Sequence, residues 1–389
     1  MQRRWLMMLG AAALAGVGSP ARAGDLVVRT TDEFRRALAN ARAGQRILLA
    51  PGTYGGGHYR SGLRGTATAP IVIASLDPNR PATIQGGGNG IQLSDPVHVE
   101  LRDLVFTGQT GNGLNLDDGG SSDTPARHIR LRNLVVRDVG PTGNRDGIKL
   151  SGVDDFEVIG CTIERWGDGG SGIDMVGCHR GTIRECTFRH GDAAGGSAVQ
   201  IKGGSSEIAV VKNRFFHAGH RAVNLGGSTG APYFRPLNAP YEARALRVEG
   251  NLFVGSTAPI AFVGVDGAVV RYNTLYRPAR WALRILQENT DGKVPCRNGV
   301  FTDNLIVFRS GEMVEAVNIG PNTAPQTFQF ARNWWYCEDQ PARSRVRLPV
   351  AEKEGVAGVD PRLRDPAGGD FRLHPDSPAR GRGHEAYRG

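Results

Sequence analysis

The chain has 389 residues, of which 55 are glycine, and its 47 lysines and arginines outnumber its 38 aspartates and glutamates. A net charge of +9 favours association with anionic partners but does not bear on the fold. The five cysteines form no CxxC pair and have no histidine at zinc-ligand spacing, which argues against a structural zinc site.

The first residues have the pattern of a secretory signal. Arg3 and Arg4 precede an apolar run at 5–17, and small residues flank Arg22. This run is too short to cross a bilayer, and no later run is long enough, so we expect cleavage after Ala23 and a protein in the periplasm or outside the cell. The remaining 44 basic and 38 acidic residues leave a net charge of +6. We expect an exported basic protein to bind an acidic polymer, not nucleic acid or a membrane.

Residues 31–41 predict a single helix. A cap-like Thr31-Asp32 pair precedes an apolar stripe formed by Phe34, Leu38 and Ala41. We expect this helix to cover the N-terminal end of a repeat array, because an exposed strand edge there would promote aggregation.

A short repeated unit then occupies residues 97–337, approximately. Each unit reads as a strand, a polar residue, a second strand, a loop and a third strand, with many β-branched residues and flanking glycines. One coil cannot bury its own apolar face, so the repeat predicts an all-β, right-handed parallel β-helix, a single domain over residues 24–389. The polar residue is aligned at Asp103, Asn133, Cys161, Cys186, Asn213, Asn251, Asn273, Asn304 and Asn333.

We interpret this polar column as a structural ladder. Like residues of stacked coils lie roughly 4.8 Å apart, so side-chain amides can bond one another and the backbone at the bend. Cys161 and Cys186 are expected to be small buried fillers. Stacking favours a Cys296–Cys337 disulfide in an oxidising compartment. The Pro- and Arg-rich segment 338–389 should wrap the last coil and form no second domain.

The third strand of each unit contains the candidate site. Two apolar residues flank one position, so alternation turns the flanking pair inward and the middle residue outward. Further polar candidates, Asp146, Asp168, His190, Asp192, His220 and Arg221, come just before these strands. The outward column is Asn115, Lys149, Asp174, Gln200, Asn224, Ala261, Arg284 and Asn318, and a parallel column includes Asp117, Ser151, Lys202 and Gln287.

Longer loops are predicted along one edge of this face. Insertions fall after Asp117, Gly227 and Gln287, and the longest, 228–244, contains several aromatic residues. Such loops would wall a groove in which aromatic rings stack on sugars. We therefore predict a monomer that binds an acidic polysaccharide. The predicted binding residues are Lys149, Gln200, His220, Asn224, Gln287, Asn318, Tyr233 and Arg235.

Two segments resemble a known group of enzymes. Residues 34–56, FRRALANARAGQRILLAPGTYGG, and 69–76, APIVIASL, are similar to the right-handed β-helix polysaccharide lyases of the chondroitinase-B and alginate-lyase group, within the pectin-lyase-like superfamily. The resemblance spans most of the mature chain and implies a lysine base and an arginine acid one coil later. Lys202 matches the lysine, but the arginine position falls on or near Asn224. The calcium-binding acidic cluster of the group is not clearly reproduced, so we expect no cofactor, with calcium as the alternative.

The favoured prediction is a lyase that cleaves a uronic-acid polymer by β-elimination. Lys202 would be the base, Asn224 and Arg284 would hold the carboxylate, and Arg221 or His220 would relay a proton. The same residues would make a C5-epimerase if the proton returned to the opposite face.

Two other classes remain open. A glycoside hydrolase would use Asp146 and Asp174, which belong to adjacent coils, as its paired carboxylates, with Asp168 in reserve. A non-catalytic polysaccharide-binding β-helix would need neither set, because a fold does not imply a function.

Overall fold

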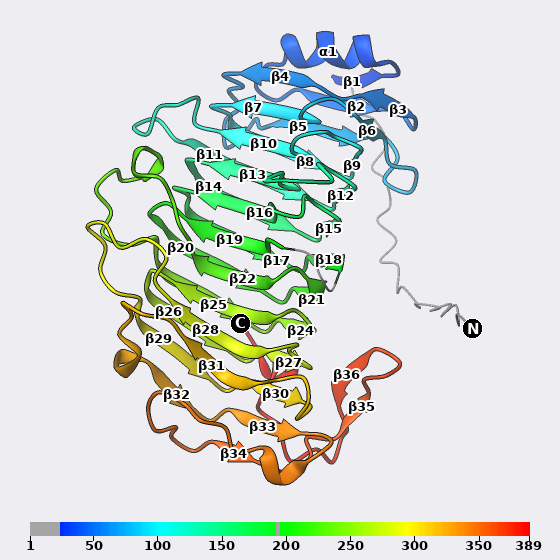
Figure 1. Cartoon of the computed structure of the whole chain (residues 1–389). Coiled ribbons are helices and arrows are strands. Elements are labelled where there is room, and N and C mark those ends of the chain that lie inside the picture. Colours follow the sequence, from blue (N-terminus) through cyan, green and yellow to red (C-terminus); the bar gives the residue numbers. More distant parts are fainter. Residues whose placement is uncertain (1–23, 192–194) are drawn as a thin grey trace.

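The computed structural model describes residues 24–191 and 195–389. The predicted signal, 1–23, and Asp192 lie outside the described residues. Within them, three long parallel sheets wind around one core as a right-handed β-helix, as the repeat predicted (Figure 1). No helix of the described chain is long and apolar enough to span a membrane.

We call the three sheets A, B and C, in the order in which each coil visits them. Sheet A comprises β1 (Asp25–Val28), β2 (Arg46–Leu49), β5 (Ile71–Ser75), β8 (Val97–Arg102), β11 (Ala126–Arg132), β14 (Val153–Ile159), β17 (His179–Arg184), β20 (Ser205–Val211), β23 (Ala243–Glu249), β26 (Val265–Arg271), β29 (Arg297–Thr302) and β32 (Gln329–Ala331). Sheet B comprises β3 (Thr53–Gly55), β6 (Thr83–Gln85), β9 (Val105–Thr107), β12 (Val135–Arg137), β15 (Thr162–Glu164), β18 (Thr187–Gly191), β21 (Arg214–Ala218), β24 (Leu252–Val254), β27 (Thr274–Tyr276), β30 (Leu305–Phe308), β33 (Trp334–Cys337) and β34 (Val356–Ala357). Sheet C comprises β4 (His58–Ser61), β7 (Ile91–Ser94), β10 (Leu114–Asp117), β13 (Ile148–Ser151), β16 (Ser171–Val176), β19 (Ser197–Lys202), β22 (Arg221–Gly226), β25 (Ala258–Val263), β28 (Trp281–Leu286) and β31 (Glu315–Ile319).

The coils begin earlier than the repeat indicated. Strands of all three sheets precede residue 97, and β1 already pairs in parallel with β2. Inside, like residues stack from coil to coil. The rings of Phe188, Phe215 and Phe253, for example, lie parallel with centroids 4.8 and 4.6 Å apart. Stacking of this kind buries one continuous apolar column along the whole solenoid.

The polar ladder is confirmed from Cys161 onward but wrong at its first two members. Register places Leu104 and Leu134 in the ladder column, and both are fully buried. Asp103 and Asn133 lie one residue earlier, where the backbone φ is 57° and 50°. Asparagine and aspartate tolerate this left-handed conformation, so the local sequence looks like the later rungs although the side chains face outward.

The segments at the two ends of the chain pack on the solenoid in different places. Helix α1 (Thr31–Ala39) covers the N-terminal end, as predicted, and buries Phe34 and Leu38 (Figure 1). Its N-cap is Thr30, whose hydroxyl accepts a hydrogen bond from Glu33 N. The C-terminal segment packs on the outside of sheet B. It contains the hairpin of β35 (Leu363–Asp365) and β36 (Asp370–Leu373). The same segment contains the short 3₁₀ turns η3 (Pro341–Arg343) and η4 (His384–Ala386), and loops earlier in the chain contain η1 (Ala231–Tyr233) and η2 (Pro325–Thr327).

The predicted Cys296–Cys337 disulfide is wrong, because all five cysteines are free and buried. Cys296 lies in the turn that leads from sheet C into β29, whereas Cys337 ends β33 of sheet B. These are different corners of the coil, so stacking cannot bring the thiols together. Cys161 and Cys186 are buried on neighbouring rungs, and Cys161 N donates to Cys186 Sγ at 3.4 Å, as expected of small fillers.

Candidate functional site

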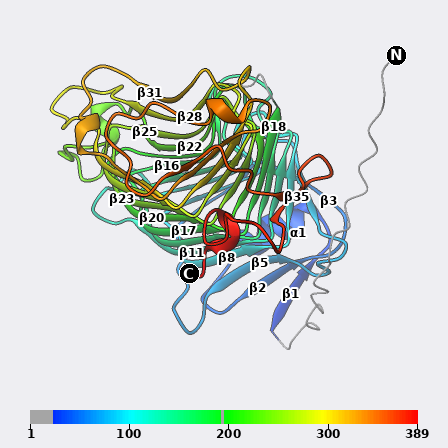
Figure 2. The same ribbon diagram turned by 90° about the horizontal axis from the view of Figure 1, so that it is seen from below.

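The outward column of sheet C is confirmed by the strand register. Successive pairs run from Asn115 through Lys149, Asp174, Gln200, Asn224, Ala261 and Arg284 to Asn318. The column continues toward the N-terminal end through Gln92 and Tyr59. The longer loops project on one side of the solenoid (Figures 1 and 2), so this face has a wall along one edge.

The parallel column differs from its prediction at Gln287. Val263 pairs with Leu286, so Leu286 occupies the position two residues beyond Arg284. Gln287 lies in the turn after β28, where its amide donates to Asn289 O at 2.6 Å and accepts from Cys296 N at 2.7 Å. The prediction that Gln287 lies on the groove face is therefore wrong, because the strand has ended and the side chain closes the turn.

Two lysines on alternate strands share one buried carboxylate. Lys149, on β13, bonds to Asp174 Oδ2 on β16, and Lys202 Nζ, on β19, lies 3.6 Å from Asp174 Oδ1. Asp174 is only 1% exposed, whereas the side chains of Lys149 and Lys202 are 21% and 18% exposed. The carboxylate therefore lies beneath two ammonium groups that face the solvent.

A second carboxylate completes this lysine–aspartate cluster. Asp146 Oδ2 lies 3.8 Å from Lys149 Nζ, and Asp146 Oδ1 accepts a hydrogen bond from Ser171 N at 2.7 Å. Burial, and then the charge of Asp174, raise the pKa of Asp146 to about 6. Burial alone would lower the pKa of Lys149, but Asp174 and Asp146 outweigh it and raise that pKa. Lys149 is therefore held as a cation.

Replacing Asp146 with asparagine is expected to change the pH dependence of stability. The folded-state pKa of about 6 lies above the unfolded value of 3.8, so the contribution of Asp146 is complete below pH 4 and is lost as the pH rises toward 6. Relative to Asp146→Asn, the wild type should lose up to about 3 kcal/mol between pH 4 and pH 7. Urea unfolding of both proteins across this range measures the difference.

Comparison of the wild type with Asp146→Asn isolates the effect of the Asp146 carboxyl on the free energy of unfolding. Burial also lowers the pKa of His190 and of His384 to about 4, which makes the fold less stable in acid, but both histidines are present in both proteins. A constant difference in unfolding free energy across the range would contradict the assignment.

A cavity of about 760 Å³ opens above the lysines. Lys149, Ser151 and Lys202 form its floor, and loops at 118–122 and 228–237 form its walls. Tyr233, on η1 in the second loop, is 71% exposed and lines the same cavity. Asp146 and Asp174 do not line it. A ligand in this cavity would meet the two ammonium groups before either carboxylate.

The long loop is held in place by buried polar contacts that the sequence did not reveal. Glu242 is fully buried, accepts hydrogen bonds from Thr229 N and Thr229 Oγ1 at 2.9 and 2.7 Å, and also accepts from Gly203 N, next to Lys202. Arg235 Nη1 donates to Asp154 Oδ1 at 3.0 Å. Arg235 lines the cavity, but its guanidinium is paired beneath the loop, where it anchors the wall.

An arginine cluster lies farther along the groove. Arg284 passes over the small Ala261 to within 3.4 Å of His220 Nε2, and it also donates to Asn318 Oδ1 at 2.9 Å. The guanidinium carbon of Arg284 lies 4.4 Å from the ring centroid of Trp281. Burial, then Arg221 and Arg284, lower the pKa of His220, so its imidazole is neutral at pH 7.

The remaining predicted residues have local partners. Arg221 Nη2 donates to Glu288 Oε1 at 2.6 Å, and Arg221 Nη1 lies 3.4 Å from Asn224 Oδ1. Gln200 accepts from Ser171 Oγ at 3.3 Å. Asp168, which is exposed, accepts a hydrogen bond from Gly143 N at 2.6 Å. The ring of His190 stacks on that of Trp166, with the ring centroids 4.2 Å apart. Their roles in binding or catalysis stay predictions.

The described residues do not fit a calcium site in this groove. No three histidine, cysteine, aspartate or glutamate side chains gather as a ligand set anywhere between 24 and 389, residues 192–194 aside. The nearest candidates, Asp146 and Asp174, are already bonded to lysines and to a backbone amide.

Comparison with known proteins identifies the fold. Residues 80–236 match the family model described as "Right handed beta helix region". An alginate lyase from Paenibacillus sp. str. FPU-7 superposes with a TM-score of 0.53 at 22% identity, over 86% of this chain and 99% of that one. Pectate lyase Pel9A superposes with a TM-score of 0.60 at 12% identity, over 94% and 93%. No curated protein sequence matches the chain. At these identities the likeness establishes the architecture alone.

Proposed function

We propose that the groove of sheet C binds an acidic polysaccharide and cleaves it by β-elimination beside a uronic acid. The observation that carries the proposal is the pair of ammonium groups, Lys149 and Lys202, on the floor of a walled cavity with their shared carboxylate beneath them. The two similar folds described above, an alginate lyase and a pectate lyase, support the same class of substrate.

In this proposal the two lysines have different tasks. Lys149, which Asp174 and Asp146 hold as a cation, binds the uronate carboxylate and stabilises the charge that builds on it during proton removal. Lys202 touches Asp174 only at 3.6 Å and acts as the base. Because Lys149 already neutralises Asp174, Lys202 is not needed for that charge balance.

The step balances in atoms and electrons. The Lys202 ammonium first releases a proton to the solvent. The resulting amine takes the proton from C5 of the uronate, the C5–H electron pair forms the C4–C5 double bond, and the C4–O4 bond breaks. The leaving oxygen takes a proton from the ammonium of Lys202, and Asp174 stabilises that ammonium in the interval. The products are a new chain end and an unsaturated uronate, and the exported location predicted from residues 1–23 would give the protein access to such polymers.

The test is the ultraviolet absorbance of the unsaturated uronate during incubation with alginate, pectate, glucuronan and glycosaminoglycans. We expect a rise with at least one polymer. New reducing ends without that absorbance would contradict the elimination and indicate hydrolysis. Retardation of a polymer in a gel, with no change in its length, would indicate a binding protein.

Hydrolysis is the second candidate because Asp146, with a pKa of about 6, neighbours a second carboxylate. Its weakness is access, since both carboxyl groups are buried and neither lines the cavity. The substitutions Asp146→Asn and Asp174→Asn should each abolish reducing-end formation if this candidate holds.

A further inference from the structure

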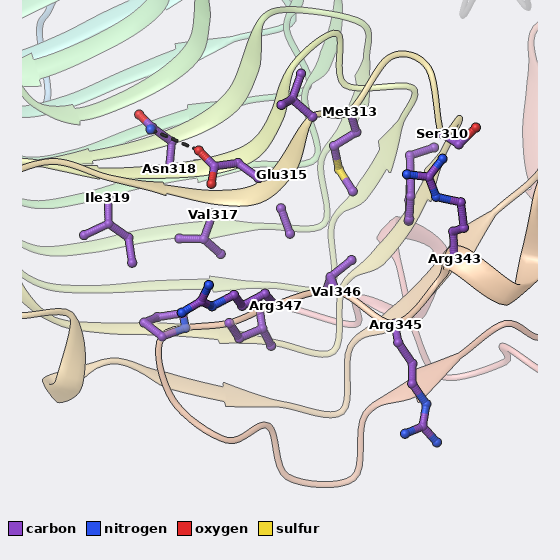
Figure 3. A pocket seen from close by; sticks show the side chains of 15 residues that line it. Ser310, Met313, Glu315, Val317, Asn318, Ile319, Arg343, Arg345, Val346 and Arg347 are labelled. Carbon is purple, nitrogen blue, oxygen red and sulfur yellow. Dashed lines mark hydrogen bonds between the residues drawn. The ribbon is translucent and has the colours of Figure 1, made fainter.

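The groove does not end at the last strand of sheet C. A second cavity, of about 730 Å³, lies between β31 and the extended segment 343–349 (Figure 3). Val317 and Ile319 lie on its β31 side, and Arg343, Arg345 and Arg347 lie on the other, where the side chain of Arg345 extends away from β31 (Figure 3). We call these three residues the arginine wall.

The arginine wall forms no ion pair and no side-chain hydrogen bond within the part of the chain that the structure describes. All three arginine side chains are exposed. Val346 and Leu348, on the opposite side of the segment, pack against the core and anchor the backbone that carries the arginines. A carboxylate near this wall would form charge-assisted hydrogen bonds without displacing any internal pair.

One acidic group faces the same cavity. Glu315 accepts hydrogen bonds from Trp281 Nε1 and Asn318 Nδ2, both at 3.2 Å, and these bonds direct its carboxylate toward β28 and the groove. Three arginines against one glutamate leave the lining with a positive charge. The exposed apolar atoms of Val314 and Ile319, which are 76% and 42% exposed, suit the C–H faces of a sugar ring.

The cavity is continuous with the groove. Asn318 is the last residue of the outward column and also lines this cavity, and its Oδ1 accepts from Arg284 Nε. From Lys202 on β19 to Asn318 on β31 there are four strand spacings, roughly 19 Å at about 4.8 Å each. A polymer that lies along sheet C and reaches β31 therefore meets the arginine wall next.

We propose that this cavity is a distal binding site for an anionic saccharide, and that the arginine wall holds the carboxylates of the chain after it leaves the last coil. The inference rests on the proposed function only for the class of ligand. Its consequence is a dependence of affinity on chain length, because a short oligosaccharide at Lys202 cannot span roughly 19 Å to the wall.

The test compares two triple variants. One, R343Q/R345Q/R347Q, removes the arginine wall. The matched control, R127Q/R132Q/R137Q, removes three exposed arginines from β11 and β12, on sheets A and B. Both are built on Lys202→Ala so that the saccharide stays intact, and calorimetry measures affinity for disaccharides and decasaccharides prepared from alginate and from pectate.

The wall variant should bind the decasaccharide about tenfold more weakly (about 1.4 kcal/mol), and its affinity for the disaccharide should not change. The control variant should keep its affinity for both saccharides. Equal losses in the two variants, or no loss in either, would overturn the proposal. So would a wall variant that keeps saccharide affinity but loses binding to phosphatidylglycerol vesicles, since that result assigns the cavity to a lipid surface.

The two proposals can fail separately. If the wild type releases no unsaturated uronate but its decasaccharide affinity depends on the wall, the elimination chemistry fails and the distal site stands. If the wild type cleaves the polymer and its affinity is independent of the wall, the distal site fails and the elimination stands.

Discussion

The substitution Lys202→Ala is expected to lower kcat on the cleaved polymer by about a hundredfold to ten-thousandfold, the usual contribution of a general base. Lys202 is the only lysine of the cavity floor that is not held by a bonded carboxylate, since Asp174 bonds directly to Lys149. Its removal leaves no amine at that point of the floor. Initial rates of ultraviolet absorbance increase, measured over a range of polymer concentrations, separate kcat from KM.

Three further variants make this result specific. Lys202→Arg keeps the charge but cannot act as a base at neutral pH, so it should be as inactive as the alanine variant. Lys149→Ala removes the carboxylate-binding cation and should raise KM as well as lower kcat. Lys353→Ala, an exposed lysine outside the groove, should behave as the wild type. Wild-type rates in Lys202→Arg, or a loss below tenfold in Lys202→Ala, would remove Lys202 from the mechanism.

The substitution Asn273→Ala is expected to destabilise the fold by about 3 kcal/mol or more. Asn273 is fully buried, and its Oδ1 accepts from Asn251 N and Nδ2 at 3.0 and 2.9 Å. Its Nδ2 donates to Val248 O at 2.9 Å and to the next rung, Asn304, at 3.0 Å. Alanine would leave several of these buried groups unpaired, at roughly 1–3 kcal/mol each. Urea unfolding followed by circular dichroism measures the loss.

The matched control is Asn133→Ala. In the sequence, Asn133 occupies the same place in the repeat, but its side chain is exposed and makes one hydrogen bond, to Asp103 Oδ1 at 3.0 Å. The control should cost about 1 kcal/mol, mainly because alanine disfavours a φ of 50°. Equal losses for Asn133→Ala and Asn273→Ala would show that the ladder does not contribute through its buried bonds.

The candidate site was predictable where it depends on strand alternation. One apolar residue on each side of Lys149 or Asp174 is enough to place the middle residue outside, because the side-chain period of a strand is two. The same rule places Leu286, two residues beyond Arg284, in the parallel column, so Gln287, three residues beyond, was wrongly assigned to it. The rule could not separate Asn133 from Asn273, because an outward left-handed residue and an inward ladder residue differ by one position in the same local sequence.

The sequence by itself determined the architecture, the capping helix and the order of polar residues along the groove. Repetition and alternation can be seen along the chain, and stacking of the coils preserves their order. Tertiary structure alone decided which charges meet. It placed Asp174 beneath both Lys149 and Lys202, buried Glu242 under the long loop, and brought the arginine wall against β31. These contacts depend on how the loops and the C-terminal segment fold back across the coils. The periodicity of the sequence does not predict which residues they bring together.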